Sequence, residues 1–293
     1  MKIFSIFFRS KKRKIATISI LAIVIIIFMA LGPLLLDNFY AEINVDINSI
    51  SEPKQSLRIV TFNIHQYWSQ EDADLFANKF LSLFKSINPD IIGLQESWDS
   101  YSSNETFNVA WFAIKLNMYY LKFAGSNSSY LHGLGILSRY PFIDSNYLIL
   151  KDSDTIFTRT LIWGQITTPV GNITVFNTHL DTFPSQPNQI NQTRVIYNVT
   201  KNYSNAILLG DLNIPDSLFL ESYRFITEKY EDAWVASGHK TYEGRTWPSD
   251  LPLLRVDYIL LQGRHWLIVK NTTRTLGDVS YSDHLGLTTE ITL

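Results

Sequence analysis

The sequence predicts an α/β or α+β sandwich preceded by one N-terminal transmembrane helix. An uncharged apolar run over residues 15–36 predicts the membrane helix. After residue 57, short runs rich in β-branched and apolar residues alternate with segments of helical spacing. Some of these runs are adjacent, as in hairpins, which favours a mixed sandwich over an all-parallel, doubly wound sheet. With 46% hydrophobic and 14% aromatic residues the chain can bury a sizeable core, and nothing after residue 57 requires a second domain.

The apolar run from Ile15 to Leu36 contains 22 residues and no charge. At about 1.5 Å per residue it spans roughly 33 Å, enough to cross a hydrocarbon core of about 30 Å. Lys11-Lys12-Arg13-Lys14 directly precede it, so the positive-inside rule predicts a cytoplasmic N-terminus and an extracytoplasmic domain. A cleaved signal peptide is the alternative, although its apolar region usually has only about 7–15 residues. The expected organisation is a basic cytoplasmic segment (1–14), a transmembrane helix or signal anchor (15–36), a linker (37–56) and one domain (57–293).

Charge is distributed unevenly along the chain. Residues 1–36 carry six cations and no acid, whereas the rest carries 19 basic and 27 acidic residues, a net charge of −8. A negative body disfavours sequence-independent binding to nucleic acid, which depends on clustered Lys and Arg, but a metal ion could supply positive charge locally. The chain has no cysteine, which excludes disulfides, thiolate nucleophiles and Cys-type zinc sites. Seven Asn-x-Ser/Thr sequons agree with an exterior domain.

Hydrophobic periodicity and turn residues predict the elements of the domain in order. Leu57–Phe62 alternates and is β-branched, as in a strand, whereas apolar residues from Leu75 to Ile87 recur at helical spacing until Asn88-Pro89. Two runs flank Pro169-Val170-Gly171 and predict a hairpin. The expected order is strand 57–62, helix 75–87, strand 90–94, helix 105–118, strands 119–124 and 133–138, hairpin strands 160–167 and 172–177, helix 187–202, strand 206–209, and strands 256–261 and 285–291.

Residues able to bind metal or move protons follow five of the apolar runs. Asn, Asp and Glu offer the hard oxygen ligands that Mg²⁺ takes, and histidines can transfer protons or stabilise charge. Their joint occurrence points to a metal-assisted phosphoester hydrolase. The five segments are Thr61-Phe62-Asn63, Leu94-Gln95-Glu96, Asn177-Thr178-His179-Leu180-Asp181, Gly210-Asp211-Leu212-Asn213 and Ser282-Asp283-His284.

Each segment taken singly also has a structural interpretation. Asp211 and Asn213 are two apart and could face one cleft, or they could form an Asx turn that closes a strand. Glu96 could be a cap or a surface residue, and a lone histidine such as His179 is usually structural. Asp257 could orient the imidazole of His284 or could pair with Arg255.

Seven segments in this order resemble the endonuclease/exonuclease/phosphatase (DNase I-like) superfamily, over about residues 57–293. The resemblance is specific for the superfamily and weak for the substrate. It rests on Ile59-Val60-Thr61-Phe62-Asn63-Ile64, Ile91-Ile92-Gly93-Leu94-Gln95-Glu96, Gly135-Ile136-Leu137-Ser138-Arg139-Tyr140-Pro141, Asn177-Thr178-His179-Leu180, Leu209-Gly210-Asp211-Leu212-Asn213, Arg255-Val256-Asp257-Tyr258-Ile259 and Ser282-Asp283-His284.

The resemblance implies a four-layer α-β-β-α sandwich with its site at one rim and Mg²⁺ as cofactor, Mn²⁺ being the alternative ion. It implies that the ion acts as Lewis acid and template without a covalent intermediate. By position, Glu96 would ligate the ion with Asn63 beside it and Asp283 completing the carboxylate set. Asp211 and Asn213 would position metal, phosphate or water, and His179 would stabilise charge on the phosphoryl oxygens. His284 would act as general base or phosphate-binding cation, oriented by Asp257. Arg159 is the candidate for the phosphate-contacting residue that the family often places between the third and fourth segments.

The expected function is therefore that of a membrane-anchored, Mg²⁺-dependent phosphodiesterase with an undetermined substrate, namely a lipid head group, nucleic acid or small molecule. An extracellular DNA or RNA endonuclease is the first alternative, and a non-catalytic, membrane-anchored binding module is the second. Trp247 could stack on a base, insert at a lipid interface or simply pack. No protein partner is inferred.

Overall fold

The computed structural model describes residues 40–42, 55–65, 73–97, 109–123, 133–150, 159–182, 186–216, 218, 220–262, 267–275 and 282–292. The chain divides into two compact units, Met1–Tyr40 and Ala41–Leu293. The expected cytoplasmic segment 1–14 and membrane helix 15–36 lie outside the described residues. Within the described ranges, no helix is both long and apolar enough to span a membrane.

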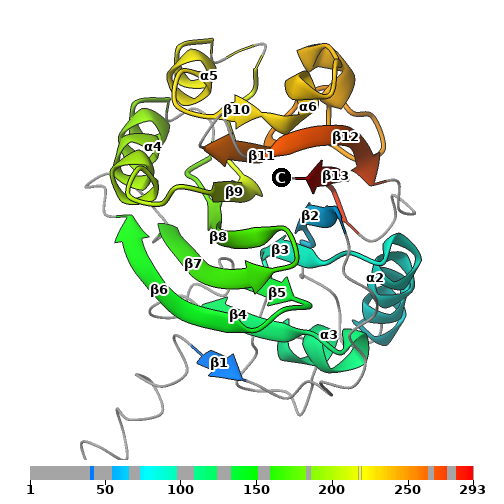
Figure 1. Cartoon of the computed structure of the whole chain (residues 1–293). Coiled ribbons are helices and arrows are strands. Elements are labelled where there is room, and N and C mark those ends of the chain that lie inside the picture. Colours follow the sequence, from blue (N-terminus) through cyan, green and yellow to red (C-terminus); the bar gives the residue numbers. More distant parts are fainter. Residues whose placement is uncertain are drawn as a thin grey trace, which may run out of the picture. The chain divides into compact units, whose positions relative to one another are not determined.

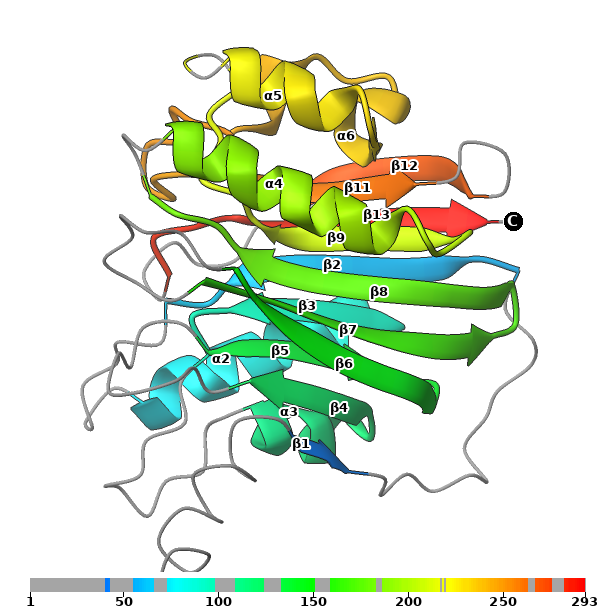
Figure 2. The same ribbon diagram turned by 90° about the vertical axis from the view of Figure 1, so that its left-hand side faces the viewer.

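The larger unit contains two β-sheets that pack face to face, as Figures 1 and 2 show. The first sheet has the order β1-β4-β5-β3-β2-β13-β12. Among the neighbouring pairs whose register is described, β2 and β3 are parallel and the others are antiparallel. Its strands are β1 (Tyr40–Glu42), β2 (Leu57–Asn63), β3 (Ile91–Gln95), β4 (Tyr119–Phe123), β5 (Leu134–Ser138), β12 (Ile268–Thr275) and β13 (Gly286–Thr292).

The second sheet has the order β10-β11-β9-β8-β7-β6, and its one parallel pair is β8 with β9. Buried strands β8 and β9 lie at its middle, and β6 forms an edge with a largely exposed pattern. Its strands are β6 (Phe142–Leu150), β7 (Arg159–Thr168), β8 (Gly171–His179), β9 (Ala206–Asp211), β10 (Glu231–Asp232) and β11 (Asp257–Gln262).

Helices pack on the outer face of each sheet, which buries a separate apolar core on each side. On the first sheet, Phe62 of β2 meets Phe80 edge to face, with the ring centroids 5.1 Å apart. On the second sheet, Ile196 and Ile226 pack over Phe176 and Leu208. The helices are α2 (Ala73–Ile87) and α3 (Val109–Leu116) on the first sheet, and α4 (Gln186–Thr200), α5 (Leu220–Thr227), α6 (Ala233–Ala236) and the 3₁₀ turn η2 (Thr241–Gly244) in the half of the second.

The α/β sandwich predicted from the sequence is confirmed, and the hairpin at Pro169 is the β7–β8 pair. The helix expected over 105–118 is present as Val109–Leu116, and residues 105–108 are outside the described ranges. Asn88 adopts φ 52° after α2, and its N–H donates to the carbonyl of Phe84, as in a left-handed C-cap. The sequence did not predict β6 and β12, because their polar, partly exposed patterns lack the apolar alternation of inner strands.

The two parallel pairs bring four chain segments together at one rim of the sandwich. In parallel strands the carboxyl ends lie at the same edge, so β2 and β3 end together, and so do β8 and β9. Contacts of β2 and β3 with β8 and β9 bring the two edges against each other. The residues that directly follow these strands therefore form one cluster.

Candidate active site

Asp211 ends β9 at the centre of the cluster, and its side chain is 1% exposed. In the same sheet it lies opposite His179 of β8 on one side and Asp257 of β11 on the other. The preceding residue must be glycine, because a Cβ on Gly210 would lie 2.3 Å from the carbonyl oxygen of Thr178. Close packing of β8 against β9 thus fixes where the Asp211 carboxylate emerges.

Asn63 links the two sheets through its amide. Its Nδ2 donates to Glu96 Oε1 at 2.9 Å and to Asp211 Oδ2 at 3.0 Å, while its Oδ1 accepts from the backbone N–H of His65 at 3.0 Å. The amide nitrogen therefore faces the two carboxylates, and the amide oxygen is used locally. In this arrangement Asn63 holds Glu96 near Asp211 as a hydrogen-bond donor, whereas the sequence predicted an oxygen ligand.

A buried polar tie beneath the rim fixes the distance between Glu96 and His179. Gln95 Nε2 donates to Asn177 Oδ1 at 2.6 Å, and Asn177 Nδ2 donates to the carbonyl oxygens of Leu94 and Gly135, each at 2.8 Å. Gln95 and Asn177 are fully buried and come from different sheets. Because Gln95 adjoins Glu96 and Asn177 lies two residues before His179, this tie sets the site's geometry.

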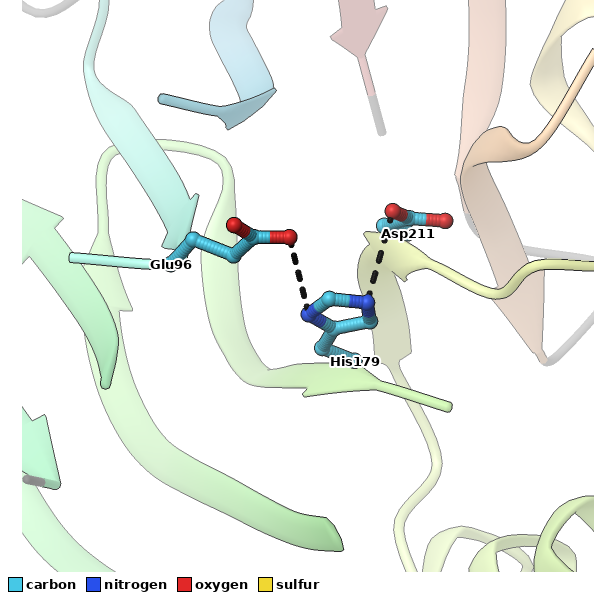
Figure 3. Close-up of side chains that lie close together, drawn as sticks. All are labelled: Glu96, His179 and Asp211. Carbon is cyan, nitrogen blue, oxygen red and sulfur yellow. Dashed lines mark ion pairs between the residues drawn. The ribbon is translucent and has the colours of Figure 1, made fainter. Parts of the chain in front are cut away.

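His179 lies between the two carboxylates, as Figure 3 shows. Its Nδ1 is 3.8 Å from Glu96 Oε1, and its Nε2 is 3.5 Å from Asp211 Oδ2. Asn213 Nδ2 is 3.0 Å from the same Nε2, and its backbone N–H donates to Asp211 Oδ1 at 3.0 Å. Asp211 therefore closes an Asx turn by accepting from Asn213, and the side chain of Asn213 contacts His179, so the two interpretations of Asp211-Leu212-Asn213 hold together.

His284 and Asp257 form a second buried pair beside Asp211. His284 Nδ1 is 2.9 Å from Asp257 Oδ2, and its Nε2 is 3.6 Å from Asp211 Oδ2. Arg255 pairs with Asp232 instead, so Asp257 orients the imidazole, which was one of the two roles considered for it. Asp257 Oδ1 is buried without a hydrogen-bond partner among the described residues.

Burial dominates the electrostatics of these groups. It raises the pKa of Asp211 to about 7, against the opposing charge of His284 and the hydrogen bond from Asn63. Burial likewise raises the pKa of Glu96. For His284 burial alone would lower the pKa, but the charges of Asp257 and Asp211 raise it to about 10. The site therefore concentrates desolvated negative charge around a protonated imidazole.

Three residues of the site adopt left-handed backbone conformations that are uncommon for side chains other than glycine. Their φ angles are 51° at Glu96, 49° at Asn213 and 41° at His65. Each residue lies in the turn that follows a strand, so the strands end abruptly and their next side chains point along the rim. Such conformations tend to gather at functional sites, where surrounding contacts hold them.

A cavity of about 260 Å³ opens over this cluster. One part of its wall is polar and charged, whereas the other part is apolar and comes from the segments 215 and 247–256. The lining residues are Glu96, His179, Thr182, Asp211, Asn213, Pro215, Trp247, Leu254, Val256, Asp283 and His284.

Asp283 lies at the exposed edge of the cavity. Its Oδ2 accepts from Trp247 Nε1 at 3.1 Å, and its Oδ1 is 3.3 Å from His65 Nδ1, with both side chains of the ion pair about 40% exposed. Sequence analysis did not select His65, although its position two residues after Asn63 is a signal that could have found it. Asp283 lies 4.0 Å from His284 Nε2 and is not part of the tight groups that could hold a metal.

Arg159, the candidate phosphate contact, is 1% exposed and does not line the cavity. Its Nε lies 3.9 Å from Asp181 Oδ1. Burial lowers its pKa, whereas the charges of Asp211, Asp181 and Glu96 favour the charged form. The structure therefore places Arg159 beneath the site as a buried cation. Arg139 is structural, because it bonds Asp90 and Asn88 at the opposite rim.

Comparison with known proteins agrees with this arrangement. The model of the Endonuclease/Exonuclease/phosphatase family matches residues 60–284, which include all of the clustered residues. The chain belongs to this family. The family resemblance drawn from the sequence is thus confirmed, and the chain is grouped with phosphoester hydrolases. No curated protein gave a match.

Solved structures of the family show the same fold. An endonuclease/exonuclease/phosphatase family protein from Leptotrichia buccalis has a TM-score of 0.68 and 20% identity, covering 81% of this chain and 100% of that chain. D. rerio TDP2 complexed with single strand DNA product has a TM-score of 0.66 and 18% identity, covering 82% and 100%. A mannosyl-6-phosphatase from Bacteroides thetaiotaomicron has a TM-score of 0.65 and 16% identity, covering 81% and 100%. At these identities the likeness concerns the fold.

The donor set fits a divalent metal ion. Within each of two groups, potential ligand atoms lie within 4.8 Å of one another: Glu96 with His179 and Asp211, and Asp211 with Asp257 and His284. Burial raises the pKa values of Glu96 and Asp211, so a bound cation would stabilise their charged forms. Carboxylate oxygens are the ligands that Mg²⁺ prefers.

Proposed function

We propose that the protein is a membrane-anchored, Mg²⁺-dependent phosphodiesterase, with Mn²⁺ as the alternative ion. The observation that carries the proposal is the pair of desolvated carboxylates, Glu96 and Asp211, held together by Asn63 beneath an open cavity. A charge arrangement of this kind is costly for folding alone, which supports a role in binding a cation and an anionic substrate.

Glu96 and Asp211 are the residues that would hold the metal, and Asp283 at the cavity edge is a further carboxylate within the wall. When bound, Mg²⁺ supplies Lewis-acid stabilisation of phosphoryl oxygens and orients the phosphoester.

The remaining residues have separate roles in proton transfer and charge stabilisation. With a pKa raised to about 10, His284 carries a proton, and Asp257 fixes its Nδ1 so that Nε2 faces the cavity. This favours His284 as the phosphate-binding cation among the two roles considered. Asp211 and Asn213, joined by a hydrogen bond, would position the metal, the phosphate or the attacking water. His179, held by Asn213, is positioned to stabilise charge on a phosphoryl oxygen.

An extracellular DNA or RNA endonuclease is the alternative function. It is supported by the structural likeness to D. rerio TDP2, a protein crystallised with single strand DNA product. The net charge of −8 after residue 36 weighs against it, because polyanion binding requires clustered cations. A non-catalytic binding module is the less supported reading, since Glu96, His179, Asp211 and His284 are all present and adjacent.

We also propose that residues 15–36 anchor the protein as a single-pass helix, with the N-terminus in the cytoplasm and the catalytic domain outside. The proposal is supported by the uncharged run and the preceding Lys11-Lys12-Arg13-Lys14. Protease added to intact cells should degrade the domain but not a tag on the N-terminus. Protection of the domain together with digestion of that tag would contradict the orientation.

The test of function is hydrolysis by the full chain in detergent, with and without Mg²⁺, over bis-p-nitrophenyl phosphate, p-nitrophenyl phosphate, plasmid DNA, RNA and phospholipid. We expect EDTA-sensitive cleavage of the diester in preference to the monoester. Strong preference for DNA or RNA would instead support the nuclease. Two results together would overturn the hydrolase assignment. The folded protein would cleave none of these substrates, and the wild-type and Asp211→Ala chains would bind Mg²⁺ with equal affinity.

A further inference from the structure

A loop at the edge of the cavity exposes several apolar side chains. This rim loop, residues 247–254, includes Leu251 at 62% exposure, Leu253 at 51% and Trp247 at 38%. Trp247 and Leu254 also line the cavity, so the exposed surface adjoins the site directly. Leu218, 57% exposed, follows the cavity-lining Pro215 by three residues. Exposed apolar side chains beside a site often mark an interaction surface.

The rim loop is held in place from both sides. Trp247 N–H donates to the carbonyl of Leu254 at 2.9 Å, and Leu254 N–H donates back to Trp247 at 2.8 Å. Ser249 donates through its backbone N–H to the carbonyl of Asp283 at 2.8 Å and through its hydroxyl to that of Ser282 at 2.7 Å. The loop therefore presents Leu251 and Leu253 at a fixed position relative to His284 and the cavity.

Charge and tether length indicate what covers this surface. The only charged residue of the loop is Asp250, and the chain after residue 36 has a net charge of −8, which disfavours nucleic acid and anionic surfaces. The apolar run ends at Leu36, a few residues before β1 begins at Tyr40. A bilayer is thus within reach of the domain, and apolar side chains insert into the interface without needing cations.

We propose that the rim loop docks on the surface of a bilayer of neutral or zwitterionic lipids, with Leu251 and Leu253 inserted beside the cavity. Docking in this orientation would present the cavity to a phosphoester in a lipid head group. The presentation of the cavity to a lipid phosphoester rests on the proposed function, whereas the docking of the loop does not.

The absence of cysteine allows one labelled position to be compared with another. Ile268 is the matched control, because it is apolar, 54% exposed and at the opposite end of the β12–β13 ribbon from the site. Its partner is Thr292, whereas the other end of the ribbon pairs Thr275 with Gly286, two residues after His284. The experiment uses full chains carrying Leu251→Cys or Ile268→Cys, each labelled with an environment-sensitive fluorophore.

Each labelled chain is reconstituted into phosphatidylcholine vesicles with and without a spin-labelled lipid that quenches fluorophores inside the bilayer. We expect strong quenching and a blue-shifted emission at position 251 and neither change at position 268. Equal quenching at the two positions would overturn the proposal. A shift at position 251 that depends on protein concentration and not on the lipid quencher would also overturn it, by identifying a second copy as the occupant.

A double variant, Leu251→Ser with Leu253→Ser, separates docking from chemistry. We expect hydrolysis of vesicle phospholipid to fall about 10-fold, while hydrolysis of soluble bis-p-nitrophenyl phosphate stays unchanged, since two apolar side chains no longer insert. Ile268→Ser should change neither rate. If wild-type protein cleaves no soluble diester, the proposed function fails, and the quenching experiment still decides the docking. An equal fall on both substrates would contradict a docking role for the loop.

Discussion

Two carboxylates at opposite rims of the sandwich are equally buried and have very different surroundings. Asp90 precedes β3, and Asp211 ends β9, and each is 1% exposed. Asp90 accepts from the backbone N–H of Arg58 at 2.9 Å and from Arg139 Nε at 3.1 Å. Among the described residues, the charged partners of Asp211 are histidines at 3.5 and 3.6 Å.

The difference separates a structural carboxylate from a chemical one. A guanidinium that hydrogen-bonds Asp90 balances its charge at all accessible pH values, so this pair clamps the ends of α2, β3 and β5. Asp211 is held by neutral amide and backbone donors, and burial raises its pKa to about 7. A buried carboxylate without a hydrogen-bonded guanidinium is available for a metal ion or a proton.

The largest expected effect comes from removing the charge of Asp211. Asp211→Asn should lower kcat roughly 10³-fold, because the isosteric amide lacks the negative charge that would hold the cation. The free energy of unfolding should change by less than about 1 kcal/mol, since the shape is kept and a desolvated charge is lost. Turnover of bis-p-nitrophenyl phosphate and urea denaturation measure the two quantities.

His284→Ala should likewise abolish turnover and leave the fold intact, as judged by circular dichroism. Full activity in both variants would refute the site.

Mg²⁺ should stabilise the Asp211 rim and leave the Asp90 rim unaffected. At Mg²⁺ about a hundredfold above Kd we expect a stabilisation of about 2.7 kcal/mol, a Tm increase of roughly 5–10 °C. Glu96→Gln should abolish most of the increase, and Asp90→Asn should retain it. Differential scanning fluorimetry measures both, and an equal loss in the two variants would place the ion elsewhere.

The Mg²⁺ effect should also depend on pH. The folded-state pKa of Asp211, about 7, lies above the ordinary value of 3.8 for an aspartate. Protonated Asp211 therefore contributes to the free energy of unfolding of the metal-free protein. This stabilisation is complete below about pH 4 and is lost as the pH rises through 7. Because Mg²⁺ needs the deprotonated carboxylate, the Tm increase should be smaller near pH 6 than near pH 8. A larger increase at the lower pH would contradict the pKa of Asp211.

Breaking the opposite rim should affect stability and not catalysis. Asp90→Asn should lower the free energy of unfolding by about 2 kcal/mol, less than for a fully buried ion pair because Arg139 is 35% exposed. Its kcat should equal that of the wild type at temperatures where both are folded. A parallel loss of kcat would mean that the two rims are coupled.

The smallest effect is expected at the cavity edge. Trp247→Phe removes only the Nε1 donor to Asp283 and keeps an aromatic wall, so kcat/KM should fall no more than about 5-fold. Steady-state kinetics on the soluble diester measures the change. A fall as large as that of Asp211→Asn would show that the orientation of Asp283 matters as much as the buried carboxylate.

The sequence determined the inner elements because their patterns are local. Apolar strands such as Ala206–Leu209 and the helical spacing before Asn88 need no partner to be recognised. Edge strands were not predictable in this way. β6 and β12 are polar and partly exposed, and they become strands because β7 and β13 offer unpaired backbone groups at the sheet edge.

For the site, the sequence by itself predicted most of the residues that the structure brings together, because carboxylates, amides and imidazoles after apolar strands are recognisable one segment at a time. Only the tertiary structure decided their environment. It turned the amide nitrogen of Asn63 toward two carboxylates, buried Arg159 beneath the site, and paired Asp283 with His65 and Trp247 at its edge. Burial and charge balance depend on side chains that are far apart in the chain and meet only when the two sheets pack.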